Sequence, residues 1–120
     1  MRHYLINRNG DEVTGRIAQK NDFVTDIISI KTKRKTSISV KALEATSMLV
    51  TSIEDMRNLL EVNLTLNRFI REYMSDNLVE LGKRYILFLT GTGKDRYQFI
   101  MENNPELLNN IPLRFIASMI

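Results

Sequence analysis

The chain has 120 residues, of which 43% are apolar and 26% charged, a balance typical of a single globular domain and not of a disordered segment. It contains no Cys and one His, at position 3, which excludes disulfides, thiolate metal sites and histidine-based catalytic triads. Residues 1–51 carry nine Lys or Arg against five Asp or Glu, whereas residues 52–82 carry three against six. A basic first part favours a polyanionic partner.

The first part of the chain is predicted to form an antiparallel β-meander. Asn9-Gly10 separates two strand-like runs, residues 2–7 and 13–18, and predicts a tight type I′ hairpin turn. Gly15, inside the second run, predicts a bulge or bend. Further strands are predicted over residues 23–31, 37–40 and 48–51, which are rich in β-branched and other apolar side chains.

Residues 13–50 resemble a small Sm-like or SH3-like barrel. The resemblance lies in a bent strand with a central Gly and an Asn-Asp turn (VTGRIAQKNDF), followed by VTDIISIK, a basic turn and SISVKALEA. It covers less than a third of the chain and lacks the aromatic and Gly-rich residues that these families use for RNA. It therefore implies a bent, barrel-like sheet and no site residue.

The middle of the chain is predicted to be helical. Ser52 is a predicted N-cap, because its hydroxyl can accept a hydrogen bond from a first-turn amide and Glu54 and Asp55 follow it. One helix over residues 53–81 would be about 44 Å long, so we expect two helices. The predicted break lies near Ser75 or around residues 63–65, with Gly82 as the stop.

The last part is predicted to contain a hairpin and short helices. Residues 84–90 and 96–101 are apolar runs on either side of Gly91-Thr92-Gly93, a composition typical of a second β-hairpin. Asn104-Pro105 predicts a short helix over residues 105–109, and an apolar terminal helix should follow Pro112. The prediction is therefore one α+β domain, residues 1–120, with meander, one or two helices, hairpin and terminal helix in that order.

The strongest candidate site is a basic segment, residues 31–35, which carries Lys31, Lys33, Arg34 and Lys35. These cations repel one another, and phosphates would relieve that repulsion, so the segment predicts nucleic-acid binding at the tip of a β-hairpin. Additional contacts are expected from Arg16, Lys20 and Lys41. The competing interpretation is a solvated loop that protects an edge strand from aggregation.

A protein partner is the alternative. It would bind either the acidic side chains of the helical region or the apolar C-terminal residues Phe115, Ile116, Met119 and Ile120. The acidic side chains are Glu54, Glu61, Glu72, Asp76 and Glu80. A third alternative is a homo-oligomer joined through these apolar C-terminal residues. The interpretation that we favour for them is that they complete the chain's own core.

The remaining motifs do not indicate an enzyme. Gly-Thr-Gly-Lys at 91–94 has Phe88 and Asp95 where a P-loop needs Gly and Ser or Thr, and a predicted strand follows it. The neighbouring carboxylates Asp22 and Asp26, or Asp11 and Glu12, are explained by turns. We expect a non-catalytic cytoplasmic protein with no cofactor, small-molecule substrate or membrane span. The many Ile and Asn beside four Ala are typical of an AT-rich genome, such as that of many bacteriophages.

Overall fold

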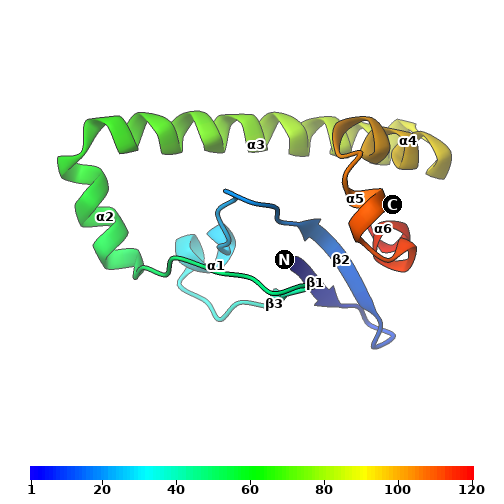
Figure 1. Ribbon diagram of the computed structural model, residues 1–120, viewed down its shortest axis with the longest axis horizontal. Helices are drawn as coiled ribbons and strands as arrows, with labels where there is room; N and C mark the ends of the chain where they lie inside the picture. Colours follow the sequence, from blue (N-terminus) through cyan, green and yellow to red (C-terminus); the bar gives the residue numbers. More distant parts are fainter. The chain divides into compact units, whose positions relative to one another are not determined.

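The computed structural model describes the backbone of residues 1–120 and every side chain except that of Leu108. The chain forms two compact units (Figure 1): unit 1 comprises residues 1–46 and 97–120, and unit 2 comprises residues 47–96. The fold is α+β, as predicted from the sequence, with a three-stranded antiparallel sheet and several helices. That both units belong to one cooperative domain stays a prediction from the length of the chain.

The sheet of unit 1 has the strand order β2-β1-β3, from β1 (Arg2–Ile6), β2 (Glu12–Ile17) and β3 (Ser39–Lys41). The predicted hairpin around Asn9-Gly10 is confirmed, but its turn is not type I′. Gly10 has a φ of 88° whereas Asn9 has no positive φ, and the Asn7 side chain closes a longer connection. Asn7 Oδ1 accepts hydrogen bonds from the amides of Asn9 and Asp11, each at 2.9 Å.

The predicted bulge is confirmed at Gly15. His3 of β1 lies opposite Arg16, but Tyr4 lies opposite Thr14, so Gly15 is the extra residue of β2. The sheet is open and does not close into a barrel, which corrects the expectation drawn from the Sm-like and SH3-like resemblance. Closure fails because two of the segments predicted as strands, residues 23–31 and 48–51, form no strand.

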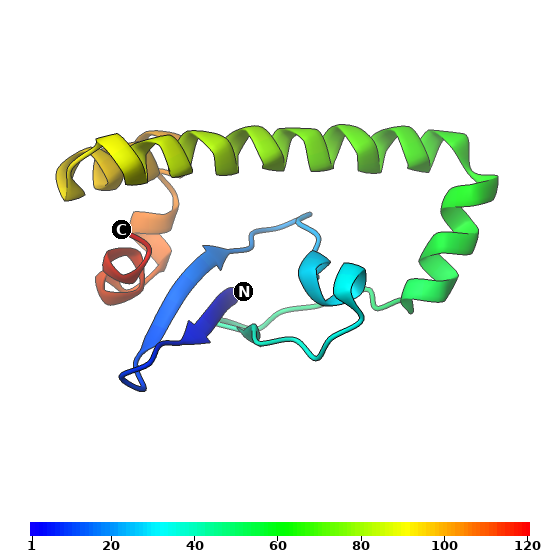
Figure 2. The ribbon, with the colours of Figure 1, turned by 180° about the vertical axis from the view of Figure 1, so that it is seen from behind.

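Residues 27–32 form helix α1 (Ile27–Thr32) and not the predicted strand, as the view from behind shows (Figure 2). The helix forms because Asp26 caps its N-terminus. The β-branched composition of the segment favoured a strand in the sequence-based prediction and outweighed this cap. Asp26 Oδ1 accepts from the amides of Ile28 at 3.0 Å and Ser29 at 3.2 Å, and the Ser29 hydroxyl donates to the Asp26 carbonyl. A capped turn satisfies these backbone groups without a neighbouring strand.

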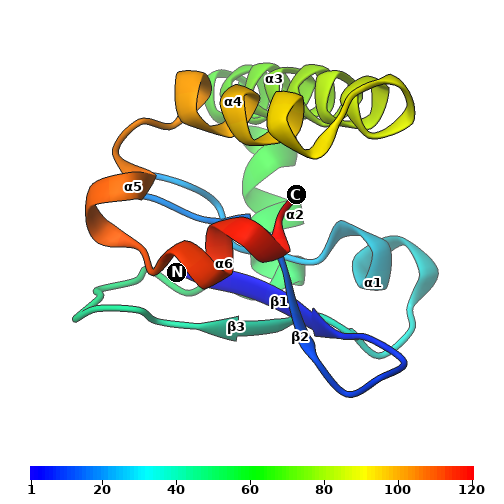
Figure 3. The ribbon, with the colours of Figure 1, turned by 90° about the vertical axis from the view of Figure 1, so that its right-hand side faces the viewer.

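The core of unit 1 is formed by residues far apart in the sequence. Ile17 of β2 packs with Ile100 of α4 (Gly93–Asn103), Leu107 of α5 (Leu107–Asn110) and Ile116 of α6 (Leu113–Ser118). Helix α4 begins in unit 2 and ends in unit 1. Helix α6 lies across the sheet next to β2 (Figure 3), so the predicted terminal helix exists and covers the sheet.

Unit 2 contains the two predicted helices, α2 (Ile53–Val62) and α3 (Leu64–Thr90). The cap at Ser52 is confirmed, since its hydroxyl accepts from the Asp55 amide at 3.0 Å. The break lies at Asn63, within the predicted range, because Asn63 Oδ1 accepts from the Leu66 amide at 2.8 Å and starts a new helix. The alternative break near Ser75 and the predicted stop at Gly82 are wrong, because α3 continues through both residues.

The predicted second hairpin does not exist, because residues 84–90 extend α3 and residues 93–103 form α4. Thr92 and Asp95 form a reciprocal capping box: the Asp95 carboxylate accepts from the Thr92 amide at 2.7 Å, and Thr92 Oγ1 accepts from the Asp95 amide. Gly91 donates its amide to the Leu87 carbonyl and ends α3. The Gly-Thr-Gly sequence is thus a helix-to-helix connection.

Within the part of the chain that the structure describes, no helix is long and apolar enough to cross a membrane.

Candidate nucleic-acid interface

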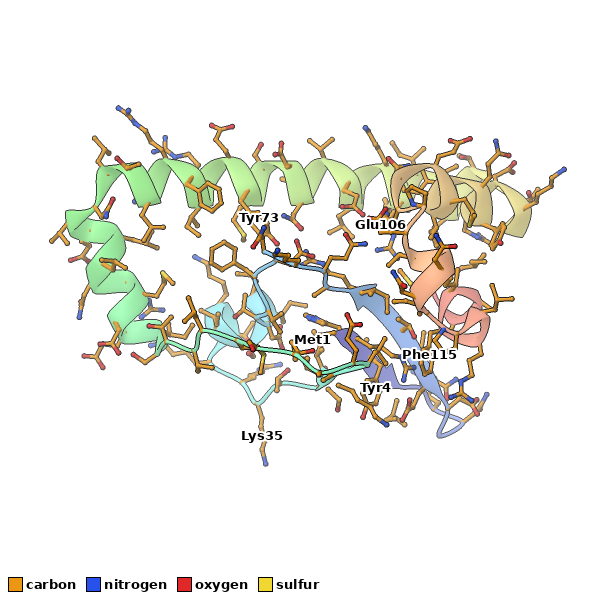
Figure 4. The ribbon with its side chains drawn as sticks, viewed as in Figure 1. Met1, Tyr4, Lys35, Tyr73, Glu106 and Phe115 are labelled. Carbon is orange, nitrogen blue, oxygen red and sulfur yellow. The ribbon has the colours of Figure 1, made fainter. Side chains whose placement is uncertain are left out.

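The basic segment lies at the C-terminal end of α1 and in the connection to β3, not at the tip of a hairpin. Lys31 is in the last turn of α1, Lys33 follows the helix, and Arg34 and Lys35 continue into the loop. All four side chains are exposed, and Lys35 points away from the chain in Figure 4. Basic side chains at a helix C-terminus are favourable, because the exposed carbonyl groups there carry partial negative charge.

A hydrogen-bonded clamp joins Asp26, which precedes α1, to Thr36, which follows the basic segment. Thr36 Oγ1 donates to Asp26 Oδ2 at 2.6 Å and accepts from the Ile38 amide at 3.0 Å. The hydrogen bond from Thr36, followed by those from the amides of Ser29 and Ile28, lowers the pKa of the Asp26 carboxyl below its ordinary value. The one carboxylate beside the basic segment is therefore engaged by neutral donors.

The cations of the basic segment have no acidic partner of their own. None of Lys31, Lys33, Arg34 and Lys35 forms an ion pair with any residue that the structure describes. Their charges are therefore available to an anion from outside the chain, which is the condition that the sequence-based hypothesis requires.

Lys33 has an unusual backbone conformation. It follows α1 with φ 54° and ψ 30°, the left-handed region in which helices usually place Gly or Asn. A lysine in this region costs free energy relative to Gly, on the order of 1 kcal/mol. The cost is tolerated at the residue that turns the chain from α1 into the rest of the basic segment.

The three additional cations predicted for the site do not form a cluster of unpaired charges as the basic segment does. In the sheet, Arg16 lies opposite His3 while Lys41 lies opposite Arg2, so their side chains project from opposite faces. Arg16 forms an ion pair with Asp22 at 3.2 Å. Lys20 is exposed in the turn after β2 and, like Lys41, forms no ion pair with a described residue.

The apolar C-terminal residues lie on the chain's own core. Ile116 is 1% exposed and belongs to the core of unit 1, while Met119 and Ile120 are half-buried and pack against that core. Phe115 is also half-buried and lies under the guanidinium of Arg2. The interpretation as part of the core accounts for these contacts, and a role in binding a partner stays a prediction.

A buried polar network in unit 1 was not anticipated from the sequence. Arg2 is 1% exposed, with its guanidinium between the rings of Tyr4 at 4.7 Å and Phe115 at 4.0 Å. It pairs with Glu12 and donates from Nε to Thr14 Oγ1 at 2.8 Å. The Ser118 hydroxyl of α6 lies 2.7 Å from Thr14 Oγ1. This network joins β1, β2 and α6, so Arg2 is a structural cation and is not part of the interface.

His3, beside this network in β1, is 7% exposed, and its Nε2 has no hydrogen-bond partner among the described residues. Burial, followed by the positive charges of Arg16 and the N-terminus, lowers the pKa of His3 below its ordinary value of 6.5. A buried imidazole of this kind is neutral near pH 7.

The carboxylates considered for catalysis have structural partners. Asp22 accepts from the Gln19 amide and pairs with Arg16, Asp26 caps α1, and Glu12 pairs with Arg2. Asp11 accepts from the Asn7 side chain. Among the described residues there is no group of three His, Asp or Glu that could hold a metal ion.

A helix, and not the predicted strand, begins at Gly93, which removes one of the arguments against a phosphate site in the Gly-Thr-Gly-Lys sequence. Phe88 and Asp95 still occupy positions where a P-loop needs Gly and Ser or Thr. The Asp95 carboxylate also occupies the helix N-terminus, where it accepts from both the amide and the hydroxyl of Thr92 at 2.7 Å. A phosphate at this position would meet that negative charge.

Comparisons with known proteins found no match: no protein-family model, no curated protein and no solved structure is similar to this chain.

Proposed function

We propose that the protein is a non-catalytic regulatory or accessory protein of the cytoplasm that binds nucleic acid, DNA or RNA, through the basic segment. The observation that carries the proposal is the set of four exposed cations within five residues that have no acidic partner among the described residues. Contacts to phosphates would relieve their mutual repulsion and release counterions from the nucleic acid. The expected contacts are to the phosphate backbone of the nucleic acid, so little sequence specificity is expected.

The distribution of charge between the two units supports this proposal. Unit 1 carries ten Lys or Arg against seven Asp or Glu, whereas unit 2 carries seven of each. The net positive charge of the chain therefore belongs to unit 1, the unit that contains the basic segment. A local excess of charge raises the rate of encounter with a polyanion.

The proposal is tested with the triple variant Lys33→Gln, Arg34→Gln, Lys35→Gln in a binding titration on labelled duplex DNA and single-stranded RNA. The matched control is Arg57→Gln, Arg68→Gln, Lys83→Gln, which removes three exposed cations from unit 2 and lowers the net charge equally. We expect the first variant to lose at least about tenfold in affinity, because three phosphate contacts are removed, and the control to bind as the unmodified chain does. Equal affinity of all three proteins, or equal losses in both variants, contradicts a site at the basic segment.

The alternative, a protein-binding inhibitor or assembly component, has less support at the two surfaces predicted from the sequence. The five acidic residues are divided between two helices, with Glu54 and Glu61 on α2 and the others on α3. The apolar C-terminal residues pack on the core of unit 1. A pull-down after nuclease treatment separates the two functions, since a protein partner survives nuclease and a nucleic-acid bridge does not.

A further inference from the structure

The two helices of unit 2 have a large exposed apolar surface. Neither α2 nor α3 has a buried residue among those described. Between Met74 and Leu89, α3 presents eight large apolar side chains that are each 40–69% exposed. They are Met74, Leu78, Val79, Leu81, Tyr85, Ile86, Phe88 and Leu89. Exposed apolar area of this extent marks an interaction surface in ordinary soluble proteins.

Five of these side chains have the spacing of a coiled coil. Met74, Leu78, Leu81, Tyr85 and Phe88 are separated by four, three, four and three residues, and we call them the α3 stripe. An apolar repeat that averages 3.5 residues matches the seam of two helices that wind around each other. The occupant of the α3 stripe is therefore expected to be another helix.

Most charged residues of this part of α3 lie away from the stripe. In heptad terms, with Leu78 and Tyr85 at a, the charges of Asp76, Glu80 and Lys83 fall at f, c and f, on the outer side of a coiled coil, whereas Arg84 falls at g, beside the seam. The e positions beside the seam are Ser75 and Gly82, which are small enough to allow two helices to approach closely. In an antiparallel pair of α3 helices the g positions face each other, so Arg84 lies opposite Asn77 and not opposite a second arginine.

A second copy of the chain also satisfies the requirements of charge and area. Unit 2 carries seven basic and seven acidic residues, so two copies meet without net repulsion. The five side chains of the α3 stripe, with Leu89 at the following e position, present on the order of 600 Å² if each has roughly 150–250 Å² of surface, which approaches the area of about 800 Å² that each partner buries in a standard interface.

A membrane surface fits these observations less well than a second helix does as the occupant of the α3 stripe. A helix that lies on a membrane needs its apolar residues on one face and its charges on the other. In α3 the apolar residues Leu66 and Leu87 lie on a different side from the α3 stripe, whereas Ile70, four residues before Met74, continues the stripe.

We propose that the chain forms a homodimer in which two α3 helices pack antiparallel along the α3 stripe. A parallel pair would place Arg71, the preceding a position, against its own copy, which is a repulsive arrangement. An antiparallel pair instead opposes Leu78 to Leu81, Met74 to Tyr85 and Arg71 to Phe88. The last of these puts a guanidinium on an aromatic ring, which is attractive.

The test measures the mass of the full chain in solution by sedimentation equilibrium. We expect twice the 14.0 kDa of one chain, and the variant Leu81→Glu is expected to be monomeric because it puts a charge in the seam. The matched control is Val79→Glu, which changes a similarly exposed residue of the same helix outside the α3 stripe and should stay dimeric. Both residues are exposed in the single chain, so circular dichroism should show that both variants keep their helices. A monomeric unmodified chain, or a Leu81→Glu variant that still dimerises, overturns the proposal.

The orientation is tested by cysteine cross-linking, since the chain has no cysteine of its own. A mixture of Met74→Cys and Tyr85→Cys chains should form a mixed disulfide-linked dimer under oxidation, whereas each variant alone should not. Cross-linking of each variant with itself, and not in the mixture, would overturn the antiparallel arrangement in favour of a parallel one.

Discussion

At the scale of single residues, the basic segment combines free charge with a locally strained backbone. Lys33 occupies a left-handed conformation that a glycine would adopt at lower cost, and its side chain has no acidic partner among the described residues. The four cations could be recognised as a candidate site from the sequence alone. The backbone conformation of the segment that carries them could not be predicted. The Asp26 cap and the Thr36 clamp that shape the loop involve side chains up to ten residues apart.

The first prediction concerns the cost of this conformation. Lys33→Gly should raise the free energy of unfolding by about 0.5–1 kcal/mol, because glycine reaches a positive φ without steric strain. Lys35→Gly is the control, since Lys35 has no positive φ and its replacement removes the same charge. The measurement is urea unfolding of the full chain; a loss of stability in Lys33→Gly as large as that in Lys35→Gly would contradict the assigned conformation.

The second prediction concerns the buried His3. Its folded pKa is lowered below 6.5, so the unfolded chain binds a proton more readily than the folded chain. The free energy of unfolding should therefore fall as the pH drops below about 6.5 and towards the folded pKa, and His3→Gln should weaken this dependence. Because the chain has one histidine, its NMR titration can be followed directly. A measured pKa at or above 6.5 would show that the imidazole is not buried.

At the scale of elements, local signals succeeded where a single cap or turn decided the structure. For this reason the hairpin at Asn9-Gly10 was predictable, though not its turn type, as were the cap at Ser52 and one of the two expected breaks, around residues 63–65. The strand predicted over residues 23–31 was wrong, because the composition favoured a strand and one carboxylate, that of Asp26, capped a helix instead.

The second hairpin was wrong for a reason that involves longer stretches of sequence. Residues 84–90 form a short apolar run whose own pattern does not distinguish strand from helix. Their helical spacing becomes visible only when Tyr85 and Phe88 are counted together with Leu78 and Leu81, on the far side of Gly82. The Thr92-x-x-Asp95 capping box was a signal in the sequence that the glycines around it obscured.

The third prediction uses Gly82, inside α3, and Gly91, its C-cap, to test this helix. A Cβ at Gly82 would meet nothing within 4 Å, so Gly82→Ala should stabilise the helix by up to about 1 kcal/mol. A Cβ at Gly91 would lie 2.8 Å from the Leu87 carbonyl oxygen, so Gly91→Ala should destabilise the end of the helix. The effects are compared by thermal unfolding of the full chain, in the Leu81→Glu background if the unmodified chain is dimeric. If Gly82 lay instead at the edge of a strand, its replacement would not raise helicity.

At the scale of the whole molecule, charge and apolar surface are divided between the two units. Unit 1 holds the net positive charge and the buried core, while unit 2 is neutral and holds the exposed apolar helix. The core of unit 1 could not be predicted from the sequence, since Ile17 and Ile116 are brought together only by folding. If the chain dimerises through α3, each dimer carries two basic segments, and simultaneous binding of both would raise the apparent affinity for a long polyanion.

The salt dependence of DNA binding tests the proposed function most directly. The affinity of the full chain for a duplex too short to hold two basic segments is measured at several salt concentrations, and its logarithm is plotted against the logarithm of the salt concentration. Four phosphate contacts predict a slope of about −3.6, and the triple variant at Lys33, Arg34 and Lys35 should reduce it to about −0.9. A slope near zero, or the same slope for both proteins, would show that the basic segment does not bind phosphates.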